Sequence, residues 1–104
     1  MSDAETAFDA VASRFLGEPA ITDGTGFGSN PGLRVDGHIF AMLVRGDFVV
    51  KLPAARCAEL TAAGAGRSLE IGTRRMREWL VVGGPPDPDA WTALARDALA
   101  FVRA

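Results

Sequence analysis

The dipeptide Asp36-Gly37 near the middle of the chain limits the possible folds more than any other pair of residues. It separates two mostly apolar runs, 33–35 and 38–44. Asp-Gly between such runs indicates a tight β-hairpin, because a type I′ turn needs positive φ at both central residues. A second turn at 45–47 leads into another apolar run, 48–52. The sequence therefore predicts a three-stranded meander whose middle strand is nearly covered on both faces.

Three amphipathic segments predict helices around this meander. The first carries apolar residues at helical spacing and ends at Gly17 and Pro19, which both interrupt helices. The second begins at Pro53, which suits the first position of a helix, and runs to about Ala63. The third begins at Asp87, whose side chain is a good N-terminal cap.

Two further strands are expected between the second and third helices, at 69–71 and 79–82, and the glycine-rich residues 22–32 are expected to form a loop. The element order is then α-β-β-β-α-β-β-α. Consecutive strands that are joined by tight turns are antiparallel. The sequence therefore predicts a two-layer α+β fold with a five-stranded antiparallel sheet, one face of which is covered by the first and third helices.

The large aromatic residues indicate where the core lies. Trp79 and Trp91 occupy periodic apolar positions, so we expect both in the core rather than on a base-stacking surface. Phe40 and Phe48 lie on consecutive strands of the meander, and we expect them to form a cross-strand pair.

The composition is that of one folded domain spanning residues 1–104. The chain is 48% hydrophobic and 23% charged with a net charge of −2, which excludes a disordered chain. Its single cysteine excludes a disulfide scaffold. No apolar run approaches the roughly 18 residues that cross a bilayer, and the acidic N-terminus has no apolar segment typical of a secretory signal. We therefore expect a cytoplasmic protein with no membrane partner.

One stretch of the chain resembles a known family. Phe27-Gly28 is followed by GLRVDGHIFAMLV at 32–44 and by FVVKL at 48–52. This pattern is similar to the N-terminal domain of the TfoX/Sxy competence regulators. MREWLV at 76–81 and the tryptophan-containing last segment are also similar to the broader YjbR/MmcQ-like group.

The resemblance implies a two-layer α+β fold and an association with nucleic acid. Full-length competence regulators of this family act on gene expression, and YjbR-like proteins have been proposed to bind DNA. The resemblance brings no catalytic residues to this sequence, so it implies a regulatory or accessory role.

The charge distribution gives a candidate site. Residues 34–77 hold eight of the eleven basic residues but only four of the thirteen acidic ones. Such a local excess creates a basic patch although the whole chain is acidic, with a pI near 5.3. The candidate nucleic-acid-binding residues lie on an expected arginine-rich loop and nearby turns: Arg67, Arg74, Arg75 and Arg77, supported by Arg45 and Lys51.

Two other functions stay open beside nucleic-acid binding. The first is a protein-interaction or chaperone-like module that uses the free edges of the sheet, either with another protein or with a second copy in a homodimer. An enzyme would need Cys57 and His38 to meet as a nucleophile and base, and the sequence gives no reason to expect that. Metal ligands are too few, and Gly24-x-Gly26-x-Gly28 precedes a strand rather than a helix. We therefore predict a non-enzymatic domain with no catalytic residue, metal or cofactor.

Overall fold

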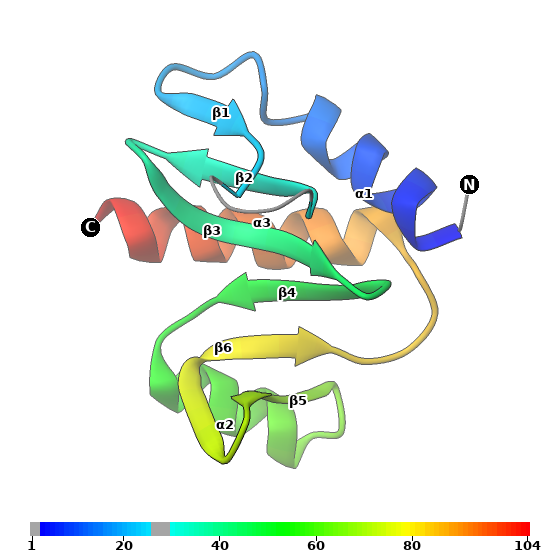
Figure 1. Cartoon of the computed structure of the whole chain (residues 1–104), viewed down its shortest axis with the longest axis vertical. Coiled ribbons are helices and arrows are strands. Elements are labelled where there is room, and N and C mark those ends of the chain that lie inside the picture. Colours follow the sequence, from blue (N-terminus) through cyan, green and yellow to red (C-terminus); the bar gives the residue numbers. More distant parts are fainter. Residues whose placement is uncertain (1–2, 26–29) are drawn as a thin grey trace.

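The computed structural model describes residues 3–25 and 30–104, which form three helices and six strands in the order α-β-β-β-β-α-β-β-α (Figure 1). The helices are α1 (Asp3–Ser13), α2 (Ala54–Ala62) and α3 (Pro88–Arg103). The strands are β1 (Ile21–Asp23), β2 (Gly32–Val35), β3 (His38–Val44), β4 (Asp47–Lys51), β5 (Gly66–Ile71) and β6 (Arg74–Val82). The predicted α+β class is confirmed, whereas the predicted five-stranded sheet is wrong because the sheet has six strands.

The unpredicted strand is β1, which falls mostly in the segment expected to be a loop. It pairs antiparallel with β2, so that Ile21 lies opposite Val35 and Asp23 opposite Leu33. Only Ile21 of its three residues is buried, so the segment has no alternating pattern. It becomes a strand because β2 offers it a hydrogen-bonding edge. The end of the glycine motif and the Phe27-Gly28 part of the family resemblance lie outside the described residues.

All strands of the sheet are antiparallel, in the order β1-β2-β3-β4-β6-β5. The predicted hairpin turn is confirmed, since Asp36 has a φ of 51° and Gly37 a φ of 84°. Arg45 and Gly46 show the same combination, 53° and 82°, at the turn between β3 and β4. Tight turns thus join β2, β3 and β4. The chain then passes through α2 and β5 before β6 pairs with β4.

The main core lies between the sheet and the helices, and residues from all three helices contribute to it. The ring of Phe48 is stacked on Trp91 of α3, with centroids 4.5 Å apart and planes 6° apart. The core position of Trp91 is thus confirmed. The expected pair of Phe40 and Phe48 is wrong: Phe48 lies opposite Leu43 in the register, and Phe40 meets Phe15 with centroids 5.7 Å apart.

The helix ends follow local chemistry. Asp87 caps α3 as predicted, because its carboxylate accepts hydrogen bonds from the backbone N–H groups of Asp89 and Ala90. Pro53 is the residue before α2 rather than its first residue. Helix α1 ends at Ser13, earlier than expected, and Phe15 is buried in the turns that follow it.

A second, smaller apolar cluster lies on the other face of the sheet. Met42, Val49 and Val81 form it, and half-buried residues including Trp79 pack around them. Trp79 is therefore not in the main core, contrary to the prediction. Because the described helices all contribute to the opposite face, this second face is where the sheet is open (Figure 1).

Candidate binding groove on the open face of the sheet

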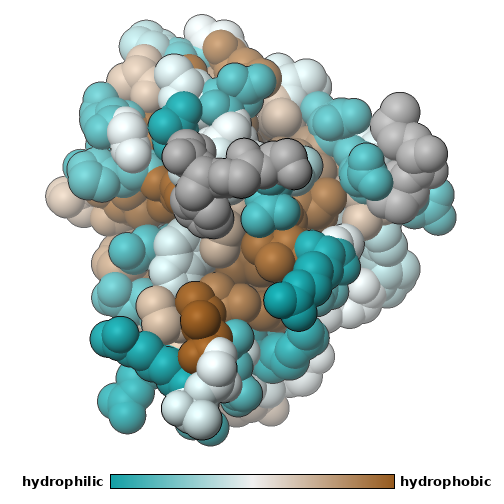
Figure 2. Space-filling model, in the orientation of Figure 1, coloured by the Kyte–Doolittle hydropathy of each residue, from teal (hydrophilic) through white to brown (hydrophobic). Residues whose placement is uncertain are grey.

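A groove of about 790 Å³ lies on the open face of the sheet, and we call it the sheet groove. Figure 2 shows hydrophobic residues gathered in a hollow at the centre of this face, with hydrophilic residues around them. Its lining comes from β3, β4, β5 and β6, their turns, one residue of α2 and one residue that precedes β2. The lining residues are Asn30, Met42, Val44, Arg45, Asp47, Val49, Thr61, Arg67, Ser68, Leu69, Glu70, Ile71, Gly72, Arg75 and Val81.

The floor of the sheet groove is a row of aliphatic side chains across three strands. Met42 on β3 lies opposite Val49 on β4, and Val49 lies opposite Val81 on β6. Successive residues of a strand point to opposite faces, so Phe48 and Val50 enter the main core while Val49 faces the groove. The floor is buried by its surroundings, since these three side chains are at most 7% exposed.

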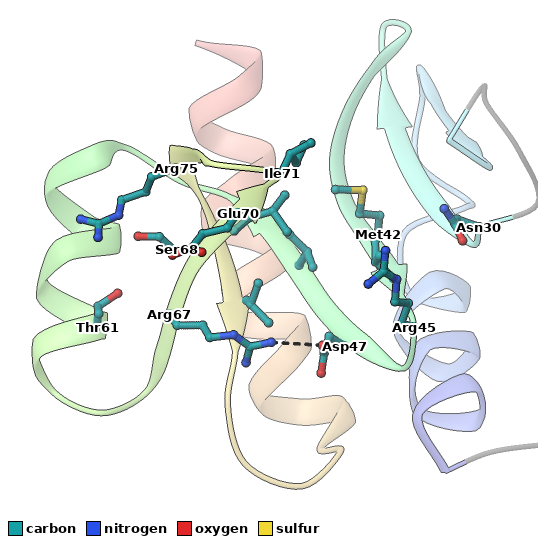
Figure 3. A pocket seen from close by; sticks show the side chains of 15 residues that line it. Asn30, Met42, Arg45, Asp47, Thr61, Arg67, Ser68, Glu70, Ile71 and Arg75 are labelled. Atoms are coloured by element: carbon teal, nitrogen blue, oxygen red, sulfur yellow. Dashed lines mark hydrogen bonds and ion pairs between the residues drawn. The ribbon is translucent and has the colours of Figure 1, made fainter.

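One wall of the groove is the end of the β5–β6 hairpin. The register shifts between Ser68, which pairs with Leu80, and Leu69, which pairs with Met76. Residues 77–79 therefore have no partner on β5, and such a bulge bends a hairpin. Figure 3 shows Ile71 and Glu70 on this hairpin and Met42 and Arg45 across the groove from them.

The structure brings three of the six predicted site residues to the sheet groove. Arg67 and Arg75 line it from the hairpin, and Arg45 lines it from the turn between β3 and β4 (Figure 3). Lys51 does not line it, and its Nζ lies 5.5 Å from the centroid of the Trp79 ring. Arg74 and Arg77 are exposed on β6 outside the groove.

The expected arginine-rich loop is wrong in its local structure. Arg67 lies on β5, and Arg74, Arg75 and Arg77 lie on β6, so that only residues 72–73 separate the two strands. The segment lacks the apolar alternation that would have indicated strands. It forms strands because β5 and β6 pair along most of their length.

An ion pair crosses part of the groove floor. Nη2 of Arg67 donates to Oδ2 of Asp47 at 3.4 Å. Arg67 lies beside Val81 in the register, and Asp47 is two residues from Val49 on the same strand. The pair therefore reaches from β5 over β6 to β4. Both side chains are about half exposed or more, 66% for Arg67 and 48% for Asp47.

Sequence reasoning missed the groove residues that carry no positive charge. The sequence pattern places Asp47 in a turn and the floor residues in ordinary strands. Ile71 was part of a predicted strand, but nothing in the sequence indicated that its side chain is 61% exposed at the hairpin end. The position of Val49 could have been predicted, because side chains alternate along a strand and Val49 therefore lies on the opposite face of the sheet from Phe48 and Val50.

The two residues of the possible nucleophile–base pair lie in different settings. Cys57 is buried on α2, which packs against β5 and β6, and its Sγ lies 3.7 Å from the carbonyl oxygen of Leu52. His38 is exposed at the start of β3. Burial raises the pKa of the Cys57 thiol, because the thiolate loses solvent there, and the charge of Glu78 acts in the same direction.

Within residues 3–25 and 30–104, no three side chains of His, Cys, Asp or Glu are grouped so that they could hold a metal ion. Nor does any helix of the described chain have the length and apolarity needed to cross a bilayer.

The fold and the groove define a small two-layer α+β domain with one open sheet face. No protein-family model matches the chain, and neither a curated protein nor a solved structure matches it.

Proposed function

We propose that this chain is a small non-enzymatic binding domain, similar to the TfoX N-terminal and YjbR-like proteins, that contacts nucleic acid in a regulatory or accessory role. The observation that supports this proposal most is the display of arginines on the β5–β6 hairpin. Arg74, Arg75 and Arg77 are exposed on one strand, and Arg67 and Arg45 lie nearby at the sheet groove.

Four of these five arginines have no ion pair within the part of the chain that the structure describes and are available to phosphate groups, whereas Arg67 is paired with Asp47. Within the described ranges, Arg45, Arg74, Arg75 and Arg77 take part in none of the ion pairs, whereas Arg14, Arg56 and Arg96 each have an acidic partner. A guanidinium without an internal partner gives up no ion pair when it binds a phosphate. Phosphate contacts dominate the affinity of most nucleic-acid-binding proteins and carry little sequence information.

The test is fluorescence anisotropy of a labelled duplex and a labelled single strand at two salt concentrations. We expect micromolar binding that weakens steeply with salt, because bound cations release counterions from the phosphates. The double variant R74E/R75E should bind much more weakly. The control R56E/R103E makes the same change in net charge on α2 and α3, so it isolates the long-range effect of charge, and it should bind more tightly than R74E/R75E.

Either of two results would contradict this function. One is the absence of binding at low salt, where electrostatic attraction is strongest. The other is equal affinity of R74E/R75E and R56E/R103E, which would show that the hairpin arginines are not the contact surface.

A second candidate function, a protein-interaction or chaperone-like module, is favoured by the apolar side chains on the hairpin wall of the sheet groove. Ile71 is 61% exposed there and Leu69 lines the groove beside it, so apolar side chains of a protein partner can pack on them. Light scattering across a dilution series tests its homodimeric form. A mass that falls from dimer to monomer on dilution would support self-association, and a constant monomer would exclude it.

A further inference from the structure

We infer that the sheet groove binds an acidic, aliphatic peptide segment of a partner protein, and that a carboxylate of this segment replaces Asp47 at the Arg67 guanidinium. The inference rests on the protein-binding candidate, and it assigns Arg67 to a peptide rather than to nucleic acid. It names the chemistry of the partner and one residue of this chain, Asp47, that competes with it.

The volume and the apolar lining of the groove determine which apolar side chains a ligand should carry. The groove volume of about 790 Å³ lies within the range of roughly 300–1,000 Å³ that is typical of small-ligand pockets, so the groove can take several side chains. The floor residues Met42, Val49 and Val81 are at most 7% exposed, so the accessible apolar surface is extended by Leu69 and Ile71 on the hairpin wall. Methionine has a flexible, polarizable side chain that adapts to partners of different shape.

The charges around the groove set the polar part of the ligand. Three arginines line it, Arg45, Arg67 and Arg75, against two carboxylates, Asp47 and Glu70. Arg45 and Arg67 stand on opposite sides, since Arg45 follows β3 and Arg67 lies on the hairpin (Figure 3). A segment with carboxylates beside its aliphatic side chains would therefore meet a guanidinium whichever side its acids face.

A carboxylate of the ligand must displace Asp47 from its ion pair with Arg67. At 3.4 Å and with both side chains about half exposed or more, this is a weak surface pair and is easily replaced. A ligand segment that covers the groove would exclude water from around Arg67, so its carboxylate would meet the guanidinium in a less hydrated setting, where a charged hydrogen bond is stronger. Asp47 is thus an internal competitor for the ligand, and removing its charge should strengthen binding.

The experiment begins with a displayed library of random twelve-residue peptides, selected on the wild-type chain. We expect enrichment of peptides with Asp or Glu beside Leu, Ile, Val or Met. The affinity of one synthesised winner is then measured for three variants. Asp47→Asn should bind about threefold to tenfold more tightly, Arg67→Glu at least about tenfold more weakly, and R56E/R103E within about twofold of the wild type.

The fold of each variant is checked independently of binding. Asp47 and Arg67 are both well exposed, so their substitutions should leave the far-ultraviolet circular dichroism spectrum and Tm close to those of the wild type. The gain in affinity for Asp47→Asn is the readout that a merely structural role of the ion pair would not produce, since loss of a stabilising pair would weaken binding or leave it unchanged.

Three results would overturn the inference. The first is a library that yields only basic or uncharged peptides, or none, and the second is an Asp47→Asn variant that binds no more tightly. The third is displacement of the selected peptide by a single-stranded oligonucleotide whose own binding needs Arg67, which would make nucleic acid the ligand of the groove. Failure of R74E/R75E to weaken oligonucleotide binding concerns the proposed function alone and leaves this inference standing.

Discussion

Cys57 shows how burial at a single residue determines both reactivity and pH dependence. Its side chain is 2% exposed and packs in the main core, so a thiol reagent in water has no path to it in the folded chain. The raised pKa means that the folded state holds the thiol proton more tightly than the unfolded chain does. The same burial therefore makes the thiol inert near neutral pH.

We predict that the free energy of unfolding falls as the pH rises through the alkaline range, in part because of Cys57. Below the ordinary thiol pKa both states are protonated and the contribution of Cys57 is complete. Above it the unfolded chain loses the proton first, so unfolding becomes easier. Urea unfolding of the wild type and of Cys57→Ala at several values between about pH 7 and pH 10 measures this. The wild type should lose more stability than the variant, and parallel losses would refute the prediction.

A helix, strand or turn could be predicted from the sequence when its own residues determine its conformation. Asp36-Gly37 and Asp87 determine a turn and a cap through their own backbone and side-chain chemistry, and both were predicted correctly. Strand β1 has no such signal, because its conformation depends on pairing with β2. The bend in β6 depends on a register shift relative to β5, and no periodicity along one strand reveals it.

The same distinction applies to the candidate site. The arginines could be predicted from the sequence, since they cluster in it. Their position beside an aliphatic floor could not be predicted, because Met42, Val49 and Val81 come from three strands and meet only through the register of β3, β4 and β6. The Arg67–Asp47 pair joins β5 to β4 across β6 and is equally a product of the sheet order.

The β5–β6 hairpin depends on Gly66, and this gives a prediction for the element as a whole. A Cβ atom at Gly66 would lie 2.4 Å from the carbonyl oxygen of Val81, and a backbone atom cannot move aside as a side chain can. Gly66→Ala should therefore cost about 1–3 kcal/mol of unfolding free energy, the usual cost of overpacking. Gly17→Ala is the matched control, because a Cβ there meets nothing within 4 Å. Urea denaturation that finds the two variants equally stable would contradict this prediction.

At the scale of the whole molecule, the main core joins the sheet to all three helices, so the domain should unfold in one step. Phe48 and Trp91 connect β4 to α3, and Cys57 connects α2 to the same cluster. A chain of 104 residues with one main core is within the size range that usually unfolds cooperatively.

We predict coincident unfolding midpoints for the helices and for the packed core. In a Trp79→Phe variant, the remaining fluorescence reports the stack of Trp91 on Phe48, and far-ultraviolet circular dichroism reports the helices. The two signals should give the same urea midpoint within error. Separate midpoints would show that α2 and the β5–β6 hairpin unfold apart from the rest of the domain.

The placement of every described helix on one side of the sheet has a consequence for how such a domain can diversify. Substitutions on the helix side change the core and lower the free energy of unfolding, so few sequence changes are tolerated there. Side chains around the sheet groove are largely solvated at their ends, and replacing them leaves the core intact. A gene duplicate could therefore acquire a new binding preference through a few changes at positions such as Arg45, Asp47 and Arg67 while its folding remained that of the ancestor.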